Sequence, residues 1–237
     1  MILKHSHLYL KTALFAVLLS NTPLSWANNP IDNKAIKISE ALIQYYGTIH
    51  KPNIDQQVKL QALIHDIPEA EVRKKFADEI KNNQTIYDLM LADVKNEMSA
   101  KDLELMKSAL KRQTTIQSAI YASCVVSGQV STLPSEIKVP LSCKVPERDL
   151  DEVIAFTPNP KNTSIQEFVR YATELEKAYK QTPKIVFQTT ILLHKDGDLL
   201  LPESDDPQYF PSSVTNRFSG TTEEQLMKDN EMQDLAP

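Results

Sequence analysis

Apolar residues recur at steps of three and four through most of residues 33–124, which is the spacing of amphipathic helices. In the first of these stretches, Ala35, Ile38 and Leu42 lie on one helical face, and Gly47 provides a stop signal. A later helix starts at Ser99–Asp102, a capping-box pattern with Asp in place of the usual Glu. The spacing predicts four or five helices, at 33–46, 55–65, from 68 onward, 85–97 and 99 to about 124.

The pattern changes between residues 127 and 146. Prolines at 134, 140 and 146, together with Gly128, exclude a continuous helix. Val130, Ile137, Val139 and Leu141 indicate only short extended pieces. We therefore expect a loop here, and the boundary between two halves of the chain.

The second half combines one clear helix with a hairpin. Ser164 and Glu167 form a full capping-box pattern, and Pro183 ends the helix that follows. A β-branched run at 184–193 and an apolar run at 199–201 flank the Asp196–Asp198 turn. Asp-Gly between apolar runs is a strong hairpin signal, whereas a calcium loop would need further oxygen ligands that are missing.

These elements predict a mainly α protein. Its expected parts are a helical bundle over 28–126, a disulfide-pinned loop over 127–146, and a helix beside a small β-hairpin over 147–203, packed on the bundle as one domain. Residues 204–237 hold two basic and seven acidic residues and lack convincing apolar periodicity. They predict an acidic, flexible tail that is dispensable for folding.

The first 27 residues have the pattern of a secretory signal peptide. Lys4, His5, His7 and Lys11 precede the apolar run Thr12–Leu19, and Ser25-Trp26-Ala27 places small residues where a signal peptidase reads. About eight apolar residues are too few to cross a bilayer, which needs about 20. We expect cleavage after Ala27 and a periplasmic or secreted protein without membrane insertion.

The expected location bears on the two cysteines. Cys124 and Cys143 are the only two in the chain, with eighteen residues between them. An even pair in an oxidising compartment predicts a disulfide bond. A redox pair usually has two residues between its cysteines, and a zinc site would need two further ligands.

Composition excludes several function classes. The chain has 237 residues and only four glycines, which stand far apart, so a glycine-rich phosphate loop is not expected. After cleavage, 24 basic residues face 31 acidic ones, a net charge of −7. A negative exported protein has no electrostatic reason to bind nucleic acid.

No catalytic, cofactor-binding or metal-binding residue is predicted. His50, His65 and His194 form no metal-binding pair, and no serine lies in a nucleophile elbow. Paired carboxylates among helices remain an alternative, and the residues considered for it are Glu69, Glu71, Glu97 and Glu104.

The pattern as a whole favours a non-enzymatic, exported protein that binds another protein, such as a periplasmic accessory, inhibitor or toxin-neutralising protein. One alternative is a cell-envelope hydrolase using paired carboxylates. Another is a helical carrier of an apolar ligand, for which methionines give an adaptable lining, here Met90, Met98 and Met106. Aromatics of the kind enriched at interfaces are expected mostly at core edges: Tyr45, Tyr46, Tyr121, Tyr171, Tyr179, Tyr209 and Phe210.

Overall fold

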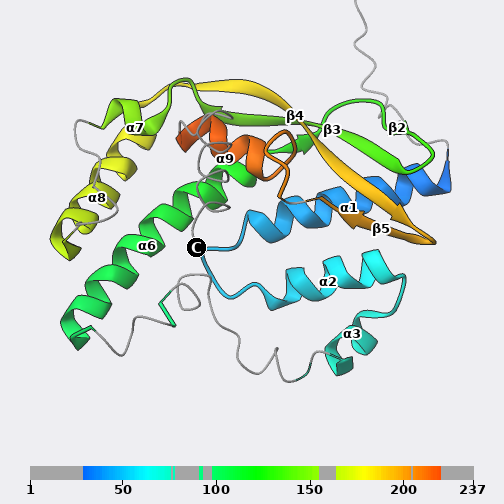
Figure 1. Ribbon diagram of the computed structural model, residues 1–237, viewed down its shortest axis with the longest axis horizontal. Coiled ribbons are helices and arrows are strands. Elements are labelled where there is room, and N and C mark those ends of the chain that lie inside the picture. The colour runs from blue at the N-terminus through cyan, green and yellow to red at the C-terminus, as the bar shows by residue number, and fades with distance from the viewer. Residues whose placement is uncertain are drawn as a thin grey trace, which may run out of the picture.

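A computed structural model describes residues 29–75, 77, 91–92, 98–154, 164–203 and 205–219. In these ranges an antiparallel sheet lies across one side of the molecule and helices pack beneath it (Figure 1). The helices are α1 (Pro30–Tyr46), α2 (Ile54–His65), α3 (Glu69–Lys75), α6 (Ala100–Tyr121), α7 (Leu150–Val153), α8 (Ile165–Gln181) and α9 (Ser212–Ser219). The strands are β1 (Val125–Val126), β2 (Ser131–Thr132), β3 (Glu136–Pro146), β4 (Lys184–Asp196) and β5 (Leu199–Pro202).

The sheet has five strands in the order β1-β3-β4-β5, and β2 pairs with the same strand β3. β3 and β4 pair along eleven residues, from Glu136 opposite His194 to Pro146 opposite Lys184. Side chains alternate between the faces of a strand. The core face of β3 is therefore formed by residues that are 0–1% exposed, namely Ile137, Val139, Leu141, Cys143 and Val145.

Pro140 lies inside this central strand without breaking it. Its carbonyl accepts a hydrogen bond from the Ser127 N–H, 3.0 Å away, on the side of β1. In an antiparallel strand the N–H and C=O of one residue point to the same side. The N–H that proline lacks would therefore face the interval between β1 and β2, and the ladder with β4 loses nothing.

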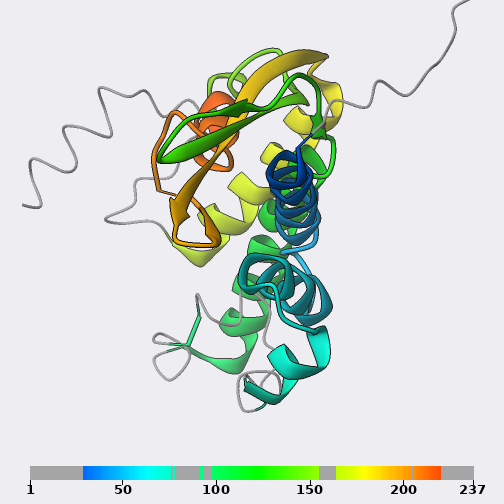
Figure 2. The same ribbon diagram turned by 90° about the vertical axis from the view of Figure 1, so that its right-hand side faces the viewer.

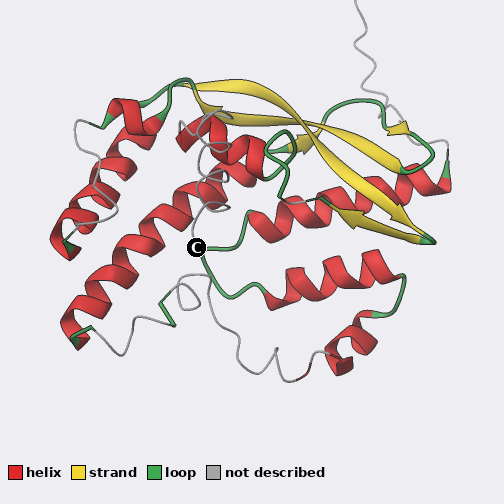
Figure 3. Cartoon of the chain, in the orientation of Figure 1, coloured by secondary structure: helices red, strands yellow, loops and turns green. Residues whose placement is uncertain are grey.

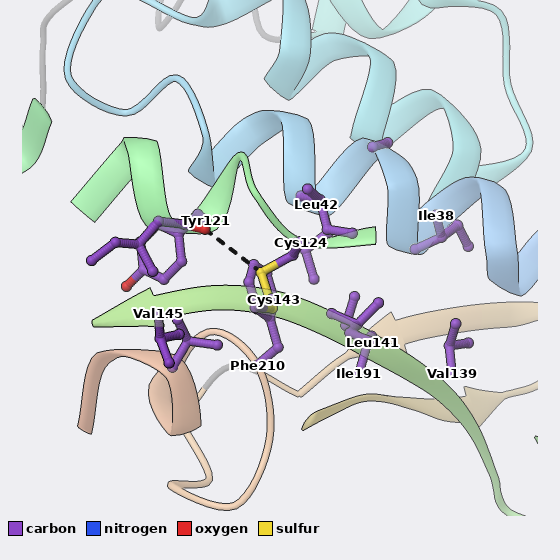
Figure 4. Packing of buried hydrophobic residues seen from close by; sticks show 14 of the residues in the cluster. Ile38, Leu42, Tyr121, Cys124, Val139, Leu141, Cys143, Val145, Ile191 and Phe210 are labelled. Atoms are coloured by element: carbon purple, nitrogen blue, oxygen red, sulfur yellow. Dashed lines mark hydrogen bonds between the residues drawn. A yellow bond between two sulfur atoms is a disulfide. The ribbon is translucent and has the colours of Figure 1, made fainter. Parts of the chain in front are cut away.

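Helices α1, α6 and α9 cover the core face of the sheet, and α2 and α8 flank this layer (Figures 1 and 2). The opposite face of β3 carries half-buried or exposed side chains, including Ser142 and Lys144. One continuous apolar cluster joins the helix layer to the sheet, and Figure 4 shows Ile38 and Leu42 of α1 above Leu141 and Ile191.

The expectation of a mainly α protein was wrong. The sheet is a main component of the fold, as Figure 3 shows. The segment 127–146, expected to be a loop, supplies the central strand β3. Its prolines indicate breaks when the segment is considered alone, but the partner that makes the strand, β4, begins nearly forty residues later at Lys184. The expected hairpin is the outer part of this larger sheet.

Several local predictions were confirmed. The α1 and α2 helices end at Tyr46 and His65 as the spacing indicated. Ser164 and Glu167 form the expected capping box, and the Ser99 side chain accepts a bond from the Asp102 N–H. Gly197 has φ +58°, as a type II′ hairpin turn requires at its first central residue. The expected signal peptide and most of the expected helix at 85–97 lie outside the described residues.

Residues 205–219 differ from the flexible tail expected from residue 204 onward. Phe210 and Val214 are fully buried and Phe218 is 5% exposed, and all three belong to the core cluster. The Phe210 N–H donates to the carbonyl of Thr190 on β4, 2.9 Å away. These three residues are four positions apart, which is a helical spacing, but three apolar positions among prolines and polar residues are too short a pattern to indicate a buried helix. Residues 220–237 lie outside the described ranges.

The Cys124 and Cys143 sulfur atoms lie 2.06 Å apart, the separation of a disulfide bond (Figure 4). Cys124 follows the end of α6, and Cys143 points from β3 into the core. The pair thus connects the helix layer to the central strand.

Candidate functional site

The candidate site is a groove between α6 and α8, which lie side by side in Figures 1 and 2. Both helices begin at a serine cap, which satisfies otherwise unpaired N–H groups and defines where each helix starts. The buried stripes of the two helices pack together, and their outer faces form the groove. Its volume is about 390 Å³, and it is lined by Ser108, Lys111, Arg112, Thr115, Ile116, Ala119, Glu176, Tyr179 and Lys180.

A second hollow of about 400 Å³ continues the groove along α8. It shares Arg112, Glu176 and Lys180 with the first and adds Lys177. We call the two together the basic groove. Its charged lining consists of four cations, Lys111, Arg112, Lys177 and Lys180, and one carboxylate.

The carboxylate of Glu176 is the centre of an ion-pair network. Its two oxygens accept from Lys180 and Arg112, each at 2.6 Å. Hydrogen bonds from Lys180 and Arg112 lower the pKa of Glu176 below its usual value. The carboxylate therefore stays ionised and holds the Arg112 guanidinium across the two helices. Two cations share one anion, so the groove keeps an excess of positive charge.

One wall of the groove is apolar. Ile116 and Ala119 of α6 and the ring of Tyr179 of α8 form it. The Lys184 ammonium lies over the Tyr179 ring, with its Nζ 4.0 Å from the ring centroid. The same Nζ donates to the Thr182 carbonyl at 2.8 Å and to the Tyr179 carbonyl. Lys184 thus caps the end of α8 and holds the aromatic wall in place.

His50 lies near the α6 side of the groove. Its backbone N–H donates to the Ser118 hydroxyl at 3.3 Å. Burial, followed by the charges of Lys51 and Lys111, lowers the pKa of His50. The imidazole is therefore neutral at pH 7.

A smaller hollow of about 190 Å³ opens on the other face of α6, and Ile116 also lines it. Its polar lining includes Gln113, Asp151 and Tyr171. The Tyr171 hydroxyl donates to Asp151 Oδ1 at 2.5 Å. Burial, followed by this bond, raises the Tyr171 pKa, so the phenol stays protonated and ties α7 to α8.

The carboxylates considered for a hydrolase do not meet in the described structure. Glu71 pairs with Lys75 on its own helix at 3.3 Å, and Glu104 pairs with Lys107 at 3.9 Å. Glu69 is exposed on α3, and Glu97 lies outside the described residues. Each described member thus makes local helix contacts or faces solvent.

The other residues singled out in the sequence are also dispersed. His65 is exposed at the end of α2, and His194 lies 3.3 Å from Glu203 on the outer side of the sheet. Neither Met98 nor Met106 lines the basic groove or the smaller hollow, and Met90 lies outside the described residues. In the described ranges, no group of three or more His, Cys, Asp or Glu side chains is placed to hold a metal ion.

Among the aromatics, Tyr121 and Phe210 are core residues, and Tyr46 packs against both. Burial, followed by the influence of Tyr45, Tyr121 and Asp205, raises the Tyr46 pKa to about 12. Tyr179 is the member of the predicted set that lines the groove. Sequence reasoning did not single out Lys111, Arg112, Glu176 or Lys180. The available signal was exposed cations on two capped helices, which is common on any solvated helix face.

No protein-family model matches the chain, and no curated protein matches it. Among solved structures, the chain is similar to the 2.62 Å crystal structure of a "putative lipoprotein" from Bacillus subtilis subsp. subtilis str. 168, with 17% identity and a TM-score of 0.38. The match covers 79% of this chain and 57% of that chain, so this chain spans less than two thirds of that protein. A similarity this low establishes neither a shared fold nor a shared function.

None of the helices in the described ranges combines the length and the apolar character that a bilayer crossing requires.

Proposed function

We propose that this chain is an exported accessory protein that binds another protein through the basic groove. The occupant is an acidic segment of the partner that also carries apolar side chains. The observation that carries the proposal is the combination of four cations around one carboxylate with an apolar wall in a single groove.

The excess positive charge of the groove favours a negatively charged binding segment in the partner. Glu176 is already engaged by two cations at 2.6 Å, and among the groove's own residues no second carboxylate balances Lys111 and Lys177. Lys177 also has Glu174 at 3.6 Å, outside the groove lining. Acidic side chains of a partner would satisfy these cations and speed association through electrostatic steering.

The apolar wall of the groove favours a partner segment that carries apolar side chains as well as acidic ones. The exposed Ala119 and the half-buried Tyr179 ring offer a surface for aliphatic or aromatic side chains, and the buried Ile116 lies beneath them. An amphipathic helix placed in a groove uses apolar anchors three and four residues apart, with polar residues at the rim. A simple polyanion would neutralise the cations but would leave the apolar wall exposed to water.

Export is the second part of the proposal. It is supported by the basic, then apolar, then small-residue pattern of residues 1–27. The cysteine pair at disulfide distance fits an oxidising compartment.

A synthetic acidic amphipathic peptide, with leucines at helical spacing and glutamates elsewhere, tests the binding proposal. The purified chain should bind it, and should not bind the same peptide with every glutamate replaced by lysine. Arg112→Glu combined with Lys180→Glu should weaken binding at least about tenfold, because two attractive contacts become repulsive. Titration calorimetry at low and high salt measures both effects.

Glu176→Gln is the opposing variant, since it removes the groove's carboxylate and should tighten binding. Lys144→Glu changes the same type of charge on the exposed side of β3, outside the groove lining, and is the matched control. Equal affinity for both peptides, or an equal loss in Lys144→Glu and in the groove variant, would overturn the proposal.

A further inference from the structure

The chain leaves its last described helix close to the basic groove. Phe218 and Ser219, at the end of α9, line the smaller hollow beside α6. Ile116 lines both this hollow and the basic groove. The two are therefore separated by the width of α6, which is about 10 Å.

The eighteen residues after Ser219 combine acidic and apolar side chains, as the proposed occupant of the groove does. They contain five carboxylates and one lysine, a net charge of −4. Four large apolar residues stand among them. The carboxylates are Glu223, Glu224, Asp229, Glu231 and Asp234, and the apolar residues are Leu226, Met227, Met232 and Leu235.

We propose that residues 220–237 bind in the basic groove of the same molecule and compete there with the partner's acidic segment. This inference rests on the proposed function, because it assigns an internal competitor to the same site. The protein is then partly self-blocked, and a partner must displace the segment in order to bind.

The length and the net charge of residues 220–237 both favour binding of this segment in the basic groove. Eighteen residues can span up to about 60 Å when extended, several times the width of α6. The smaller hollow is nearer to Ser219, but its lining contains Asp151 and neither lysine nor arginine. A segment of charge −4 is repelled there and attracted across α6, where Lys111 and Arg112 line the groove.

The first experiment uses the full chain with the segment neutralised, combining Glu223→Gln, Glu224→Gln, Asp229→Asn, Glu231→Gln and Asp234→Asn. The probe is the synthetic acidic peptide described above. A tethered segment has an effective concentration near the millimolar range, and it lowers apparent affinity by the fraction of grooves that it leaves free. We expect the neutralised chain to bind the peptide about tenfold more tightly than the unaltered chain.

Equal affinity in the two chains would overturn the inference and leave the proposed function standing. Absence of binding in both chains would overturn the proposed function, and a second measurement then decides the inference alone. A photo-crosslinking side chain at Thr115, in the groove lining, should become linked to a peptide from residues 220–237, as mass spectrometry detects. The same group at Val186, 64% exposed on the sheet, is the matched control.

The link at position 115 should weaken in the neutralised chain. If position 115 gives no link, or if positions 115 and 186 give equal ones, the inference is wrong.

Discussion

At the scale of single residues, Phe210 contributes most clearly to the core. It is fully buried, and its ring meets Tyr46 at 5.6 Å and Tyr121 at 5.5 Å in edge-to-face geometry. Edge-to-face pairs add stability beyond the area they bury. Phe210→Ala should therefore lower the free energy of unfolding by about 3–5 kcal/mol, as measured by urea unfolding.

Val186→Ala provides the comparison, because this side chain is 64% exposed. Its loss should change the unfolding free energy by about 0.5 kcal/mol or less. Similar effects of the two substitutions would show that the segment around Phe210 does not belong to the cooperative core.

Glu176 gives a pH-dependent prediction. Its pKa lies below the usual 4.5 because Lys180 and Arg112 stabilise the ionised form. A lowered carboxyl pKa contributes stability above the unfolded-state value, and this is lost as the pH falls through the folded-state value. The unfolding free energy of the unaltered chain should exceed that of Glu176→Gln by about 1 kcal/mol or less at pH 7.

This difference should disappear as the pH is lowered below 4.5, and 1 M salt should reduce it at pH 7 through screening. Urea unfolding at a series of pH values measures it. A difference that grows on acidification would contradict the assigned ion pairs.

At the scale of elements, α9 and the segment before it complete the core. Phe210, Val214 and Phe218 lie in the main apolar cluster. Deletion from residue 204 onward should therefore abolish cooperative thermal unfolding or lower the melting temperature by more than about 10 °C. Circular dichroism measures both.

Deletion from Gly220 onward is the matched variant, because it keeps all three of these core residues. Its melting temperature should stay close to that of the unaltered chain. If both deletions left melting unchanged, the packing of α9 on the sheet would be contradicted.

The cysteine pair links two elements, the end of α6 and β3. The purified exported protein should show no reactive thiol before reduction and two afterwards, in a denaturing thiol titration. Closing a loop with eighteen intervening residues is worth about 3 kcal/mol on chain-entropy arguments. The Cys124→Ser, Cys143→Ser double variant should melt at a lower temperature. Two thiols before reduction would reject the bond.

At the scale of the whole molecule, export determines the compartment in which the groove meets a partner. We expect the mature chain to start at Asn28, with a net charge of −7. Intact-mass measurement of protein from the envelope or secreted fraction tests this. A chain that retains residues 1–27 would contradict export.

Interactions between residues close together in the chain could be predicted from the sequence, and interactions between distant residues could not. Ser164 and Glu167 lie three residues apart, so a stretch of four residues contains both partners of that capping box. The ends of α1 and α2 and the turn at Gly197 are local in the same way. Local geometry depends on a few neighbouring residues, and those residues are adjacent in the sequence.

The sheet and the groove depend on distant partners. β3 is a strand because β4 pairs with it along eleven residues, and its proline is tolerated because of where its missing N–H points. The groove exists because Arg112 and Glu176, 64 residues apart, meet across α6 and α8.

By itself, then, the sequence determined the helices before the sheet and the long helix α8, the caps at Ser99 and Ser164, the hairpin turn, and an N-terminal segment with the pattern of an export signal. Only the tertiary structure decided that a proline-containing segment is the central strand, that Phe210 is core, and which exposed cations face one another. Periodicity records which side of an element is buried, but not which other element buries it.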